Sequence, residues 1–303
     1  MKLWNKYHTP KTVDEALAVL AEYKGHARVI AGGTDLLIDL RAEGAEPQEA
    51  LVDITTIREM CEITADAKYA YIGGGVTHSR IVKSTAFADH ATCLVESCGV
   101  VGGPQVRNVA TLGGNVAHAL PAGDGTTSLV ALDASVEVVV SGERKWLPVR
   151  ELFLGPGKSI LDSTRDILVR FRFELAQANQ GTAFKRIMRP QGVALPILGC
   201  AVWIETDEAG ENYVDARICL APVAPTPYRA TNVEDALKGQ PITEETLRNA
   251  LDVAHDTLNP RTSKYRATSD YRQEMIEVLL KRTIPLAVNR AVTGTAIPEG
   301  VGA

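Results

Sequence analysis

Two diglycine segments constrain this chain more than any other feature of its sequence. The first is Ala31-Gly32-Gly33-Thr34-Asp35, which follows a short run ending in Val29-Ile30 and precedes Leu36-Leu37. The second is Thr111-Leu112-Gly113-Gly114-Asn115, which continues through Pro121-Ala122-Gly123-Asp124 into an apolar run. Because glycine has no Cβ, backbone N–H groups at such positions can approach an anion closely. We expect both segments to be loops that lead from a strand into a helix and contact one dinucleotide.

Neither segment has the form of a common phosphate cradle. No Gly-x-Gly-x-x-Gly follows the first predicted strand, and no Gly-Lys-Thr occurs in the chain. An ordinary Rossmann dehydrogenase and a P-loop ATPase are therefore disfavoured. A single diglycine usually marks only a turn, so the prediction depends on two of them occurring together, each beside a threonine.

The composition excludes several classes of function. The 303 residues carry a formal net charge of −5 and only 5% aromatic residues, which gives no support to nucleic-acid binding or to an anionic membrane surface. No apolar run approaches the ~18 residues of a membrane span and the first residues lack a signal-peptide core, so we expect a cytoplasmic protein. Scattered cysteines without a CxxC pair predict reduced, mostly buried thiols and no metal site. They are Cys61, Cys93, Cys98, Cys200 and Cys219.

The order of the predicted elements divides the chain into four parts. Residues 1–57 form a first α/β lobe, and residues 58–176 form a second lobe that ends in a strand. Residues 177–290 are rich in strands and then in helices, while residues 291–303 are small and polar and predict a frayed tail. This arrangement predicts an α+β protein.

Local patterns place several elements. A capping-box pattern at Thr12 to Glu15 predicts a first helix that ends at Gly25. Residues 166–174 alternate so that Ile167, Val169, Phe171 and Phe173 would share one face of a strand. A turn at residues 207–210 predicts a hairpin. Helical patterns follow at residues 233–237, 247–258 and 271–280.

Taken together, these motifs resemble those of a known family, the FAD-binding medium subunits of the molybdenum hydroxylases. The molybdenum hydroxylases include enzymes of the carbon monoxide dehydrogenase and xanthine dehydrogenase type. The resemblance rests on both diglycine segments, on residues 105–110, 121–124 and 131–134, on residues 221–227 with Arg229, and on residues 269–272. It covers nearly the whole chain. It implies a two-lobed FAD-binding domain of the vanillyl-alcohol-oxidase-like (PCMH) type, followed by a smaller α+β C-terminal flavoprotein domain.

The resemblance also implies where a non-covalent FAD would bind. The first loop would hold the pyrophosphate through its amides, Asp124 would accept hydrogen bonds from the cofactor, and Lys185 would lie near the flavin ring, with Arg189 adding to its charge. Val101 stands where some relatives carry an aromatic residue. The implied cofactor-binding residues are Ile30, Ala31, Gly32, Gly33, Thr34, Asp35, Val101, Thr111, Gly114, Asn115, Asp124, Leu168 and Lys185.

Simpler roles stay open for some of these residues. Asp124 could cap the helix that follows it, and Lys185 could lie on a solvated strand edge. For His118 we expect a packing role and not proton transfer, and we assign no role to the other histidines. No cysteine-rich insertion interrupts residues 66–124 or 136–172, so FAD would be the only redox centre of this chain.

The family's chemistry implies an electron-transfer subunit. A large subunit would hold molybdopterin, a small subunit would hold two [2Fe-2S] clusters, and this chain would pass electrons from those clusters to NAD⁺ or another acceptor within a heterotrimer or its dimer. One alternative is a self-contained FAD-dependent oxidoreductase that binds its own substrate. Another is a non-redox nucleotide-binding assembly module. The organic substrate and the acceptor are left open by the sequence.

Overall fold

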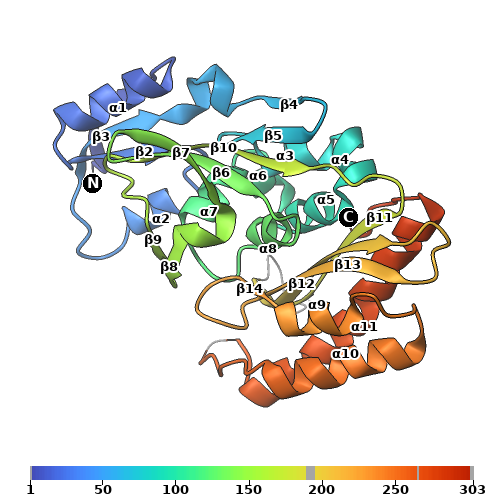
Figure 1. Cartoon of the computed structure of the whole chain (residues 1–303). Helices are drawn as coiled ribbons and strands as arrows, with labels where there is room; N and C mark the ends of the chain where they lie inside the picture. Colours follow the sequence, from blue (N-terminus) through green and yellow to red (C-terminus); the bar gives the residue numbers. More distant parts are fainter. Residues whose placement is uncertain (1, 189–194, 265, 301–303) are drawn as a thin grey trace.

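Three main sheets organise the chain in the computed structural model, which describes residues 2–188, 195–264 and 266–300. Figure 1 shows the N-terminal sheet and its helix at one end of the molecule and the C-terminal helices at the other, with the second sheet and a group of short helices between them. The predicted α+β class is confirmed.

The N-terminal sheet is parallel, with the strand order β1-β3-β2. The side-chain oxygen of Thr12 accepts a hydrogen bond from the Glu15 amide at 3.1 Å, so the predicted helix start is confirmed. Val13, Ala16 and Leu20 of this helix are buried in the core of the lobe. The elements are β1 (Trp4–His8), α1 (Val13–Glu22), β2 (Ala27–Ile30), α2 (Leu36–Asp39) and β3 (Gln48–Asp53), followed by single 3-10 turns at Ile54–Thr56 and Arg58–Met60.

The second lobe is an antiparallel five-stranded sheet with the order β4-β5-β10-β6-β7, together with a group of helices. Two of these helices, α5 and α8, are buried along their whole length, so they form the centre of the molecule. The elements are β4 (Ile63–Ala65), β5 (Tyr69–Gly73), α3 (His78–Val82), α4 (Thr85–His90), α5 (Thr92–Gly99), α6 (Pro104–Arg107), α7 (Leu112–Ala117), α8 (Asp124–Ala131), β6 (Ser135–Val140), β7 (Glu143–Pro148), a 3-10 turn (Val149–Leu152), β8 (Phe153–Gly155), β9 (Lys158–Ser159) and β10 (Ile167–Glu174).

Strand β10 does not keep the regular alternation that its sequence predicts. Its pairing with β6 shifts by one residue after Leu168, which is a β-bulge. Ile167 and Val169 pack in the core of the N-terminal lobe, whereas Leu168, Phe171 and Phe173 pack in the core of the second lobe. The predicted common face of the four residues is therefore wrong, because the extra residue at a bulge reverses the side chains that follow it.

The C-terminal sheet, β11-β12-β13-β14, lies between two layers of helices. Phe184, Ala201 and Trp203 on one face belong to the same buried cluster as residues of α5 and α8, while the other face is covered by the C-terminal helices (Figure 1). The predicted hairpin is confirmed as β12 and β13. The elements are β11 (Gln180–Met188), β12 (Pro196–Thr206), β13 (Tyr213–Ala221), β14 (Tyr228–Arg229), α9 (Thr231–Leu237), α10 (Glu244–Thr257) and α11 (Ser269–Thr293).

The segment after α11 is anchored, and the expected frayed tail is wrong for residues 294–300. Arg290 donates a hydrogen bond to the carbonyl of Ile297 at 2.6 Å, and the amide of Glu299 donates to the Glu96 carboxylate at 2.9 Å. The side chain of Glu299 also pairs with Lys185. These contacts tie the C-terminal segment to the second lobe. Residues 301–303 lie outside the described residues.

Among the residues that the structure describes, no helix is both long enough and apolar enough to cross a bilayer.

Candidate cofactor site

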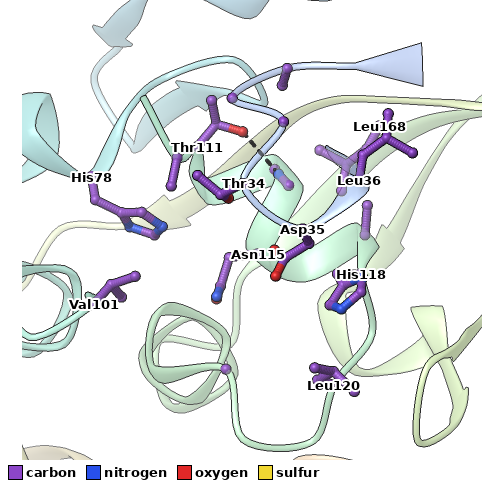
Figure 2. Close-up of a pocket in the computed structure, with 18 of the residues that line it drawn as sticks. Thr34, Asp35, Leu36, His78, Val101, Thr111, Asn115, His118, Leu120 and Leu168 are labelled. Atoms are coloured by element: carbon purple, nitrogen blue, oxygen red, sulfur yellow. Dashed lines mark hydrogen bonds between the residues drawn. The ribbon is translucent and has the colours of Figure 1, made fainter. Parts of the chain in front are cut away.

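A cavity of about 640 Å³ lies where the N-terminal lobe, the second lobe and the C-terminal sheet meet. Its wall is formed by the β2–α2 loop, the start of α7, the turn before α8 and parts of β10 and β11, and Figure 2 shows Thr34, Asp35, Thr111, Asn115 and Leu168 around it. The volume falls in the range typical of small-molecule and cofactor sites. Both diglycine segments therefore line one cavity, although they are about eighty residues apart in the sequence.

Gly32 and Gly33 of the first segment each require glycine, for different structural reasons. Gly33 has a φ of +69°, in the left-handed region that glycine adopts without strain. A Cβ on Gly32 would lie 2.1 Å from the carbonyl oxygen of Val109 and 2.9 Å from the Cα of Ala110. Only glycine therefore allows the first loop to pack directly against the backbone that leads into Thr111.

The first loop, whose residues line the cavity, carries a run of unpaired amides. Within the described residues, the backbone N–H groups of residues 33–36 donate to no protein atom. Such a run of unpaired amides at the end of a parallel strand and the start of a helix attracts an anion. This loop has the chemistry expected of a diphosphate-binding loop.

The second diglycine is not the open loop that the sequence predicts, because it forms the first turn of α7. The hydroxyl of Thr111 accepts a hydrogen bond from the Gly114 amide at 3.0 Å, which caps the helix. The amide of Gly113 donates to Gly74, and a Cβ on Gly113 would lie 2.3 Å from the Gly74 oxygen. The amides of residues 112–115 are therefore already used within the protein. Thr111, Gly113, Gly114 and Asn115 line the cavity.

Asp124 forms a buried ion pair across the boundary with the C-terminal sheet. Its carboxylate accepts a hydrogen bond from the guanidinium of Arg186 at 2.7 Å, and both side chains are at most 10% exposed. Asp124 is the first residue of α8, and its side chain makes no capping hydrogen bond. The alternative that Asp124 caps this helix is therefore wrong. The pair holds a carboxylate and a guanidinium side by side at the cavity wall.

The raised pKa of Asp124 should make the stability of the protein depend on pH. Burial raises its pKa from 3.8 to about 6, although Arg186 and Arg266 oppose the shift. Because the folded-state pKa is the higher one, the stabilising contribution is complete below the unfolded pKa and is lost as the pH rises through about 6, in total about 3 kcal/mol. We expect the free energy of unfolding of the wild type, minus that of Asp124→Asn, to fall over this window in urea titrations. A difference that rises with pH would contradict the prediction.

Twelve of the thirteen residues carried over from the family resemblance line the cavity. They are Ile30, Ala31, Gly32, Gly33, Thr34, Asp35, Val101, Thr111, Gly114, Asn115, Asp124 and Leu168. Lys185 does not, because alternation along β11 turns it away from Arg186 and toward Glu299, with which it forms an ion pair. Lys185 is therefore not part of the cavity wall, and its placement beside the flavin ring stays a prediction. Arg189 lies outside the described residues.

Several residues of the cavity wall were not predicted, and two of them carry polar side chains that matter below, Arg186 and His78. Arg186 lines the cavity, as do Arg28 and Arg266, whereas Lys185 does not; strand alternation alone does not tell which of the neighbours Lys185 and Arg186 faces the cavity. His78 lines the cavity and is completely buried; nothing in its sequence spacing indicates this. His118, for which packing was favoured, also lines the cavity and is only partly buried.

The five cysteines are free, and four of them are buried, as predicted. Among the residues that the structure describes, no group of three or more His, Cys, Asp and Glu side chains could hold a metal ion.

The fold and the cavity define a class of protein. Residues 3–173 match the family model described as the FAD binding domain in molybdopterin dehydrogenase, and residues 182–286 match the CO dehydrogenase flavoprotein C-terminal domain. The chain belongs to the family of FAD-binding subunits of molybdopterin dehydrogenases, and it is the flavoprotein part of an oxidoreductase.

Its relatives share nearly the whole length of the chain. The xanthine dehydrogenase FAD-binding subunit of Escherichia coli O157:H7 is 30% identical over 288 residues, which are 94% of this chain and 96% of the relative. The carbon monoxide dehydrogenase medium chain of Hydrogenophaga pseudoflava is 29% identical, covering 93% of this chain and 96% of the relative. A solved structure of carbon monoxide dehydrogenase from H. pseudoflava superposes with a TM-score of 0.87 at 29% identity, covering 96% of this chain and 99% of that chain.

Proposed function

We propose that this chain binds FAD in the cavity and passes electrons from [2Fe-2S] clusters of a small partner subunit to NAD⁺ or another acceptor. A large molybdopterin-binding subunit would be the other partner, in a heterotrimer or its dimer. The names of the relatives support this, since they are medium chains or FAD subunits of multi-part dehydrogenases and this chain covers more than nine-tenths of them. The observation that carries the proposal is the run of unpaired amides at residues 33–36, in the loop that lines the cavity.

The residues of the cavity fit FAD. The amides of residues 33–36 would hold the diphosphate, because they are the unpaired donors of the first loop. Ile30, Ala31 and Gly32 set the position of that loop, and Leu168 supplies apolar wall on the opposite strand. When bound, FAD would supply exchange between single electrons and electron pairs, which is the chemistry needed between iron–sulfur clusters and a two-electron acceptor.

The remaining wall residues would orient the cofactor and exclude water. Thr34, Gly114 and Asn115 offer polar groups or open backbone at the cavity surface, while Val101 adds an apolar contact. Thr111 would act indirectly, by fixing the start of α7. The buried pair of Asp124 and Arg186 would place a hydrogen-bond acceptor and a positive charge at the same wall, where low solvent exposure strengthens both.

The substrate of the assembly is proposed to be chosen by another polypeptide. The relatives carry names for very different substrates, including xanthine, carbon monoxide, nicotinate and caffeine, while their FAD subunits resemble this chain to a similar degree. A subunit with one common role would show this pattern.

A reconstitution experiment tests the proposed function. The chain alone should bind FAD, giving a flavin absorption band, but should not oxidise small organic substrates. Co-expressed with its large and small partners, it should form a complex whose flavin band is bleached by substrate and restored by the acceptor. Turnover of substrate by the isolated chain would favour a self-contained oxidoreductase. The absence of any flavin band would favour a non-redox nucleotide-binding module.

A further inference from the structure

His78 is a buried side chain whose polar atoms have no protein partner. The residue is 0% exposed, and within the described residues neither Nδ1 nor Nε2 has a hydrogen-bond partner. Its backbone is fixed, because its amide donates to the carbonyl of Ala110 at 3.1 Å and the preceding Thr77 pairs with Thr111. Because the residue is 0% exposed, the ring nitrogens do not reach solvent where they lie.

The ring lies at the cavity wall, near the start of α8. A Cβ built on Gly125 would lie 3.7 Å from Cε1 of His78 and 3.4 Å from Oδ1 of Asn115, so these three residues are close neighbours. Figure 2 shows the His78 ring and the Asn115 side chain pointing toward the same open space, with Val101 beside them. His78 is therefore a buried residue of the cavity wall.

The imidazole is neutral at physiological pH. Burial lowers the pKa of His78 to about 4, and the positive charge of Arg107 contributes to the same shift. A neutral imidazole has one N–H donor and one acceptor nitrogen. Because the two nitrogens diverge from Cε1, two partner atoms are needed, one that accepts and one that donates.

We infer that His78 binds the cofactor by hydrogen bonds to hydroxyl groups of FAD. Hydroxyls both donate and accept, so neighbouring hydroxyls can satisfy both nitrogens, whereas phosphate oxygens can only accept. FAD carries such groups in two places, the ribityl chain and the ribose of the adenosine. This inference rests on FAD occupying the cavity, which is part of the function proposed above.

The substitution His78→Leu should have opposite effects on the stability of the cofactor-free protein and on its affinity for FAD. In His78→Leu, two unpartnered polar atoms are removed from the cofactor-free protein, so its melting temperature should stay level or rise. The same change should weaken FAD binding about 10- to 100-fold, measured by quenching of flavin fluorescence as the cofactor-free chain is titrated with FAD. His78→Gln keeps a donor and an acceptor and should recover most of the affinity.

His255 offers a control outside the cavity, since it lies in α10, is exposed and is not a residue of the cavity wall. His255→Leu should leave FAD affinity unchanged, whereas His78→Leu should lower it. A His78→Leu protein that binds FAD as the wild type does, or that melts at a clearly lower temperature without cofactor, would show that the ring has only a structural role.

Two fragments of FAD distinguish whether the hydroxyls belong to the ribityl chain or to the ribose. FMN and ADP are each titrated as competitors of FAD in the wild type and in His78→Leu. If the substitution weakens FMN alone, His78 binds the ribityl chain, and if it weakens ADP alone, His78 binds the ribose. Gly33→Val separates this inference from the proposed function. If the wild type binds FAD and Gly33→Val does not, unchanged binding by His78→Leu overturns only the role of His78, whereas a wild type that binds no FAD overturns the proposed function itself.

Discussion

Replacing Gly32 by alanine should remove most of the FAD affinity of this chain and destabilise its fold. The added Cβ would lie 2.1 Å from the oxygen and 2.6 Å from the carbon of the Val109 carbonyl, so two backbone segments would have to separate. Overpacking of this kind costs about 3 kcal/mol when rigid groups must move. The same separation would displace the amides of residues 33–36, for which we expect an affinity loss of about 100-fold. Thermal unfolding and fluorescence titration with FAD measure the two effects.

Gly239→Ala is the matched control for this prediction. Gly239 has a φ of +73° and no atom within 4 Å of a built Cβ, so alanine there meets only backbone strain, about 1 kcal/mol. It also lies away from the cavity, and its FAD affinity should equal that of the wild type. Equal effects of the two substitutions on stability or on binding would show that the contact between Gly32 and Val109 is not a constraint.

The residue types in the two glycine segments predicted which segments line the cavity better than they predicted the backbone conformation of those segments. Paired glycines beside a threonine correctly indicated two segments that line one cavity. They did not show that Thr111 caps a helix whose first turn contains Gly113 and Gly114, because a loop and a capped helix start share the same sequence pattern. The distinction depends on Gly74, which lies in another strand connection and accepts the Gly113 amide.

Strand patterns gave the right elements but not the side-chain directions that matter at the cavity. In β10, a bulge after Leu168 reverses the faces, and its position is set by the pairing with β6 and not by the apolar pattern. In β11, Lys185 and Arg186 are neighbours, so the direction of each depends on which face of the sheet packs on α5 and α8. The buried state of His78 also arises only from tertiary packing.

The largest loss of stability from a single charged residue is expected for Glu96→Ala. Glu96 and Arg290 form an ion pair with side chains 1% and 2% exposed, joined at 2.6 Å and 3.2 Å. The same carboxylate accepts hydrogen bonds from the amides of Phe184 and Glu299. Removing it leaves a buried guanidinium and two amides without their acceptor, which should lower the free energy of unfolding by about 3–5 kcal/mol in urea titrations.

This pair joins α5 in the centre of the molecule to α11, β11 and the C-terminal segment, so its loss should act on all of them together. Glu62→Ala is the control, because Glu62 pairs with Arg58 on the surface, with side chains 43% and 90% exposed, and should cost less than about 1 kcal/mol. Adding Arg290→Met to Glu96→Ala removes the unpaired cation, so the double variant should be no less stable than Glu96→Ala alone. Additive losses in the double variant, or equal losses from Glu96→Ala and Glu62→Ala, would contradict the view that this pair holds the C-terminal part of the chain against the FAD-binding domain.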